Sequence, residues 1–75
     1  MEPIPSPSIL DDQEYFGVRG GRKVWRSKDG QRYYTWDNLH GEVEVFNRRG
    51  WHLGALNPET GELVKPAVKG RRLYV

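Results

Sequence analysis

The sequence predicts a single, mainly β domain: a small, strongly twisted antiparallel sheet of about five short strands, preceded by a short N-terminal helical turn or extended segment. Three observations indicate this class. Runs of aromatic and β-branched residues favour strands, the pair Asp29-Gly30 is typical of a hairpin turn, and no amphipathic helix of useful length is present. The 75 residues leave room for one modest core, and the absence of cysteine excludes disulfides.

The N-terminal part is expected to differ from the rest of the chain. We interpret residues 1–21 as a linker or N-terminal segment. Three of the five prolines lie in residues 1–8, which favours an extended conformation. Ser8 is expected to cap a short helical turn that runs to Glu14. The glycine-rich residues 17–21 are then expected to form a flexible hinge.

The folded domain is expected over residues 22–75, where strand and turn patterns alternate. The expected strands are Lys23–Arg26, Arg32–Trp36, Glu42–Phe46, Trp51–Leu56 and Glu62–Val64, with Leu73–Val75 as a last short edge strand. The expected core lies on one face of the sheet and comprises Val24, Trp36, Val43, Val45, Leu53 and Leu56. The other face is expected to be exposed and polar.

Charge is distributed unevenly along the chain. Residues 1–16 hold four acids and no base, whereas residues 17–75 hold twelve bases and six acids. A basic body favours binding to a polyanion, with an affinity that falls as salt increases. An ordinary solubilising surface would carry similar charge. No apolar run is long enough to span a bilayer, and the first residues do not resemble a signal peptide.

A cluster of acids surrounds one of the two histidines and comprises Asp37, His40, Glu42 and Glu44. In a regular strand His40 and Glu44 would lie roughly 13 Å apart, which is too far to act on one phosphodiester. Gly41 permits a bend at this point. We therefore expect the segment to fold back and to bring His40 over the strand that bears both glutamates.

An imidazole beside carboxylates suits cleavage of RNA through its 2′-hydroxyl, which needs a base, an acid and positive charge at the phosphate. Glu44 is the expected base and His40 the expected acid, with Asp37 orienting the imidazole ring. Glu42 either tunes His40 or is itself the base. The expected cations near the C-terminus are Lys69, Arg71 and Arg72. This chemistry requires no metal, and no cofactor is expected.

The same residues also have simpler interpretations. His40 and the acids could form only a solvated polar face with incidental ion pairs. The three tryptophans are expected in the core or covering the sheet rather than stacking bases. Phe46 shares the parity of the glutamates, so we expect it to be exposed and able to stack a base. His52 is either an accessory residue of the site or a surface histidine.

The motif Trp-Asp-x-x-His-Gly-Glu-x-Glu spans residues 36–44, with Arg22–Trp25 before it and His52–Gly54, Pro58–Gly61 and a basic run ending Tyr74-Val75 after it. This pattern resembles the C-terminal ribonuclease domain of cloacin and the ribosome-inactivating colicins. The resemblance covers residues 22–75 and implies that Asp37, His40 and Glu44 are catalytic. It also places Glu42 and His52 in the site.

The resemblance further implies a twisted antiparallel sheet and one cut in 16S rRNA at the decoding site of the 30S subunit or 70S ribosome, which halts translation. It implies a cognate immunity protein, and release by a producer within a larger toxin that acts in the cytoplasm of a target bacterium. The isolated domain is expected to be a monomer that does not bind a membrane.

Three departures accompany the resemblance. Phe46 stands where the family usually has tyrosine, Lys69 falls nearest to the family's functional arginine, and residues 1–21 are acidic where the family is basic and glycine-rich. Two other functions fit the composition. A small β module could grip RNA or DNA without cutting it, through its lysines and arginines. Alternatively, the carboxylate face could dock a protein.

Overall fold

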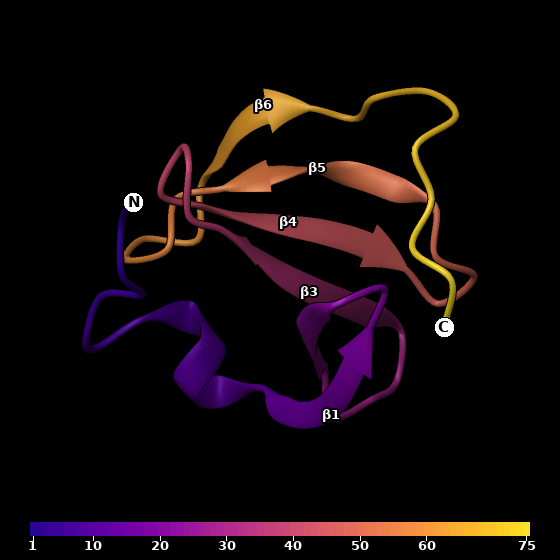
Figure 1. Cartoon of the computed structure of the whole chain (residues 1–75), viewed down its shortest axis with the longest axis horizontal. Coiled ribbons are helices and arrows are strands. Elements are labelled where there is room, and N and C mark those ends of the chain that lie inside the picture. The colour runs from indigo at the N-terminus through magenta and orange to yellow at the C-terminus, as the bar shows by residue number, and fades with distance from the viewer.

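The computed structural model describes all 75 residues and confirms the mainly β fold. Six strands form one antiparallel sheet in which each strand pairs with its neighbours in sequence (Figure 1). The strands are β1 (Glu14–Arg19), β2 (Arg22–Arg26), β3 (Arg32–Asp37), β4 (Glu42–Asn47), β5 (His52–Leu56) and β6 (Leu63–Pro66). No helix in the structure has the length and apolar character of a transmembrane span.

The predicted N-terminal helical turn is present as a 3₁₀ helix, η1 (Ile9–Asp12), which ends before Glu14. Ser8 caps this helix as expected. Its Oγ accepts a hydrogen bond from Leu10 N at 3.2 Å, and its own N–H donates to Asp11 Oδ2 at 2.9 Å. The cap fixes the helix so that the Leu10 side chain is buried in the core.

The N-terminal segment is part of the folded structure, although the sequence predicts a linker and a hinge there. β1 pairs with β2, and Gly20 and Gly21, both with positive φ, form the two-residue turn between them. Earlier in the chain, Glu2 N donates a hydrogen bond to Asn38 O at 2.7 Å. The expected hinge at residues 17–21 is therefore wrong, because these glycines serve a strand and a tight turn.

Apolar side chains are buried on both faces of the sheet. One face packs Leu10, Tyr34, Val43 and Val45, with the partly buried Ile9, Trp25, Trp36, Leu53 and Leu56 around them. The other face packs Val24, Tyr33, Phe46 and Leu73, with Phe16 against them. Val24 is thus on the opposite face from the rest of the expected core. The second face is not the exposed polar surface that the sequence predicts, since β1 and the C-terminal residues cover it.

The C-terminal segment (residues 67–75) runs from β6 back along the edge of the sheet to the start of β5 (Figure 1, yellow). It does not form the expected edge strand, and its only bridge joins Trp51 to Arg72. Leu73 N donates a hydrogen bond to Gly50 O at 2.7 Å. These contacts fix the basic end of the chain beside the second face of the sheet.

Candidate active site

The turn between β3 and β4 is bent as the sequence predicts. Gly41 N donates a hydrogen bond to Asp37 O at 2.8 Å, and Gly41 has a φ of +67°, which residues with a side chain rarely adopt. Asp37 Oδ1 accepts hydrogen bonds from the backbone N–H groups of Leu39 at 3.0 Å and His40 at 3.2 Å. One carboxylate therefore organises the turn that carries His40.

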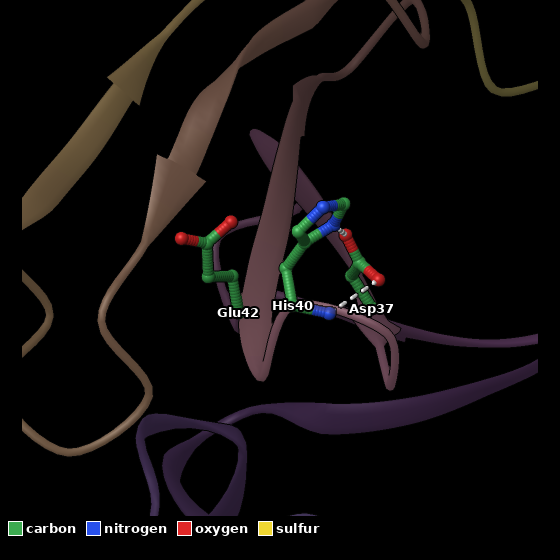
Figure 2. Close-up of side chains that lie close together, drawn as sticks. All are labelled: Asp37, His40 and Glu42. Atoms are coloured by element: carbon green, nitrogen blue, oxygen red, sulfur yellow. Dashed lines mark hydrogen bonds and ion pairs between the residues drawn. The ribbon is translucent and has the colours of Figure 1, made fainter. Parts of the chain in front are cut away.

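Asp37 and His40 also form a side-chain pair, in which Asp37 Oδ2 lies 2.8 Å from His40 Nδ1 (Figure 2). This contact orients the ring, and the His40 side chain is 52% exposed. Partial burial alone would raise the pKa of the Asp37 carboxyl. Hydrogen bonds from the His40 ring and from the His40 and Leu39 backbone outweigh burial and hold this pKa below its ordinary value of 3.8.

Glu44, on β4, is the centre of a second and buried pair. Its Oε1 accepts hydrogen bonds from His52 Nε2 at 2.9 Å and Arg71 Nη1 at 2.8 Å. His52 Nδ1 accepts the N–H of Val68 at 2.9 Å, which assigns the ring proton to Nε2. The His52 side chain is only 2% exposed. His52 is therefore not a surface histidine, and it holds Glu44 in place.

Glu42 lies at the start of β4, on the other side of His40 from Asp37 (Figure 2). Its Oε1 lies 2.9 Å from Lys65 Nζ, so Glu42 and Lys65 form an ion pair. Donor atoms of Asp37, His40 and Glu42 all lie within 4.8 Å of one another. Such a group could share a proton or hold a metal ion.

Two adjoining clefts connect these groups. The larger one has a volume of about 880 Å³ and is bordered by the β1–β2 hairpin, the β3–β4 turn and the C-terminal segment. Four residues border both clefts: Asp37, His40, Glu44 and Arg71. The bend at Gly41 thus brings the predicted acid and the predicted base to the same space, which a regular strand would not.

The position of Phe46 corrects one prediction. Phe46 is on the glutamate face as its parity predicts, but it is only 5% exposed and does not present an open ring. It packs against the edge of the His52 ring, with the ring centres 5.3 Å apart. The expectation of an exposed stacking aromatic is wrong because Leu73, from the C-terminal segment, belongs to the same buried cluster.

The cations at the site differ in part from those that the sequence predicts. Arg71 and Arg72 border the larger cleft, whereas Lys69 is exposed and borders neither. Arg22 and Lys23, at the start of β2, also line the larger cleft. Sequence reasoning missed these two because their strand is far from the acidic motif in sequence. The available signal was a basic pair directly after the Gly-Gly turn.

The fold and site together define a small antiparallel β domain with paired acids and imidazoles in a basic cleft. The family model described as Cytotoxic matches residues 8–74, and the chain belongs to this family of bacteriocin toxin domains. It is 43% identical to colicin E3 of Escherichia coli over 47 residues, and 42% identical to cloacin of the same species over 50 residues.

These matches cover 61% and 65% of this chain but only 8% and 9% of the two relatives. A further relative, colicin E6 of Escherichia coli, is 40% identical over 50 residues. The chain therefore spans less than a tenth of the length of the curated relatives that it matches. The resemblance inferred from the acidic motif is confirmed.

Proposed function

We propose that this chain is the ribonuclease domain of a bacterial toxin, which cuts 16S rRNA at the decoding site of the ribosome and so halts translation in the cytoplasm of a target bacterium. Membership of the Cytotoxic family supports the proposal. The observation that carries it is the geometry of one cleft. There, His40 is oriented by Asp37, and Glu44 faces the same space.

In the proposed reaction Glu44 removes the proton from a ribose 2′-hydroxyl, and that oxygen attacks the adjacent phosphorus. The bond from phosphorus to the 5′-oxygen breaks, and His40 Nε2 donates a proton to the departing oxygen. The products are a 2′,3′-cyclic phosphate and a 5′-hydroxyl. Arg71 stabilises the charge that develops on the phosphate.

Glu44 is favoured over Glu42 as the base by its contacts. Both hydrogen bonds to the Glu44 carboxylate go to Oε1, so its other oxygen is available to a 2′-hydroxyl. Glu42 is instead paired with Lys65 and lies beside His40. We assign to Glu42 a supporting role, in which its charge tunes the imidazole.

The test is to incubate purified domain with bacterial ribosomes and to sequence all new rRNA ends. The wild type should produce one new end in 16S rRNA. Glu44→Gln should lower the cleavage rate by about 10²- to 10⁴-fold, and Glu42→Gln should lower it less. Glu62→Gln, an exposed glutamate outside both clefts, is the matched control. Intact 16S rRNA after prolonged incubation would refute the proposed function. A larger loss of cleavage rate in Glu42→Gln than in Glu44→Gln would show that Glu42 is the general base.

The proposed chemistry uses no metal, although the side chains of Asp37, His40 and Glu42 are close enough to bind one. With a short decoding-site RNA as substrate, whose structure does not depend on the Mg²⁺ of an intact ribosome, cleavage in excess EDTA should therefore proceed at the rate seen with added divalent cations. Loss of cleavage in EDTA, with recovery when one metal is added, would contradict the metal-free mechanism. It would not contradict the proposal that 16S rRNA is the target.

A cognate immunity protein is the expected protein partner, and the domain alone is expected to be a monomer. Four basic side chains border the larger cleft: Arg22, Lys23, Arg71 and Arg72. An inhibitor that covers them should be acidic, since charge complementarity speeds association and makes it sensitive to salt. An inhibitor that associates equally fast at low and high salt would contradict this.

A further inference from the structure

An exposed cation–π stack lies beside the larger cleft, at the C-terminal segment. The Arg72 guanidinium carbon is 4.8 Å from the centre of the Trp51 ring and 5.2 Å from that of the Tyr74 ring. Trp51 is 43% exposed and Tyr74 is 75% exposed. We propose that this stack, the aromatic platform, binds a nucleobase of the RNA strand that enters the cleft. The proposal rests on the function proposed above.

The platform is held by the backbone. Trp51 and Arg72 form a β-bridge, and Arg72 Nε donates a hydrogen bond to Arg49 O at 3.3 Å. The next residue, Leu73, is buried in the second core cluster. Trp51 and Arg72 are therefore attached to ordered structure, so that little of their conformational entropy is lost when a base binds.

The platform adjoins the catalytic groups. Arg72 borders the same cleft as His40 and Glu44. The preceding residue, Arg71, donates a hydrogen bond to Glu44. An RNA strand with its phosphate between these groups would continue along the C-terminal segment, where the next exposed rings are those of the platform.

The chemistry of the platform favours an unpaired base. Every nucleobase has a π face, so an exposed ring stacks bases without selecting a sequence. Arg72 has no carboxylate partner among the ion pairs of the structure, and its charge is available to a phosphate. Arg48 and Arg49, both exposed in the turn before Trp51, add positive charge. A polyanion with flat bases matches this surface. Phe46 cannot stack a base in the same way, because its ring is buried.

The test measures binding without cleavage. Fluorescence anisotropy would follow a labelled single-stranded RNA of the decoding-site sequence in which every ribose is 2′-O-methylated, so that the attacking hydroxyl is absent. Trp51→Ala and Tyr74→Ala should each weaken binding by roughly 5- to 150-fold. Trp51→Phe keeps a ring and should bind nearly as the wild type does. Tyr15→Ala is the matched control, because Tyr15 is an exposed aromatic that borders neither cleft.

If both alanine variants bind the RNA with wild-type affinity, the proposal that the aromatic platform binds a nucleobase is wrong. A protein partner for this surface would then be favoured. An equal loss in Trp51→Phe and Trp51→Ala would overturn the proposal too, since a structural role needs the indole rather than any ring. The Tyr74 side chain is 75% exposed, so Tyr74→Ala should fold normally and still tests the proposal if Trp51→Ala misfolds. A domain that binds the methylated RNA through these rings but leaves ribosomes intact contradicts only the proposed function. Undiminished rRNA cleavage by both alanine variants contradicts only the platform.

Discussion

Two carboxylate–imidazole pairs in this domain have nearly the same contact distance and very different surroundings. Asp37–His40 measures 2.8 Å and Glu44–His52 measures 2.9 Å. The His40 side chain is 52% exposed, whereas that of His52 is 2% exposed. The contact distance alone therefore does not distinguish the two imidazoles. They differ in burial, and in the Val68 N–H that the second ring nitrogen of His52 accepts.

The two pairs are also built differently. Asp37 and His40 are three residues apart in one turn, so local backbone hydrogen bonds determine their approach. Glu44 and His52 lie on neighbouring strands, and Val68 from a third part of the chain completes the contact. We expect the exposed imidazole, His40, to govern activity and the buried imidazole, His52, to govern stability.

The largest effect should follow from removal of the exposed imidazole. His40→Ala deletes the proposed acid and should lower the rate of rRNA cleavage by about 10²- to 10⁴-fold. Its free energy of unfolding should change by less than about 0.5 kcal/mol, because half of the His40 side chain is exposed. Cleavage assays together with urea denaturation measure both quantities. Cleavage at the wild-type rate would remove His40 from the mechanism.

A smaller loss of activity should follow from removal of the cation that contacts Glu44. Arg71→Ala should lower the cleavage rate by roughly 100-fold, because Arg71 contacts Glu44 and borders both clefts. Lys69→Ala is the matched control, since Lys69 borders neither cleft and should matter little. The same ribosome assay measures both variants. A greater loss in Lys69→Ala would restore Lys69 as the functional cation.

Removal of the buried imidazole should mainly destabilise the fold. His52→Ala leaves the Val68 N–H without a partner and leaves Glu44 Oε1 with Arg71 alone. It also removes a ring that packs on Phe46. We expect a loss of about 2–4 kcal/mol in the free energy of unfolding, measured by urea denaturation. Stability equal to the wild type would mean that water replaces the ring, and the contrast between the two pairs would fail.

The smallest expected effect depends on pH. The folded-state pKa of Asp37 is below its unfolded value, so the ionised carboxylate stabilises the fold fully above the unfolded pKa and loses this effect as pH falls through the folded pKa. Asp37→Asn lacks this contribution, which should be less than about 1 kcal/mol for an exposed pair. The difference in melting temperature between the two proteins should be constant above about pH 5 and shrink in more acidic buffer. A difference that grows on acidification would contradict the assignment.

Much of the sheet was predictable because local patterns determine it. Alternation located β4 and parity placed Glu42, Glu44 and Phe46 on one face. β1 was missed because Gly17 interrupts its pattern and because glycines favour flexible segments as well as strand turns. Parity also cannot tell whether a face will be covered. Here β1 and the C-terminal segment cover the glutamate face, which is why Phe46 is buried.

The parts of the site that residues close together in the sequence form were predictable. The sequence predicted the bend at Gly41 and the contact between Asp37 and His40, which are close in the chain. It did not predict that His52 is the buried partner of Glu44, nor that Arg71 rather than Lys69 reaches the cleft. Those contacts depend on where the irregular C-terminal segment returns to the sheet, and no periodic pattern encodes that return.

The order of the strands has a consequence for how the domain can be assembled. Each strand finds its partner across a short connection, so no pairing has to wait for a distant part of the chain. A polypeptide that emerges gradually from a narrow passage could add one hairpin at a time as it appears. The turn that carries His40 would then exist once β3 and β4 have paired, but Arg71 would reach Glu44 only when residues 67–75 arrive.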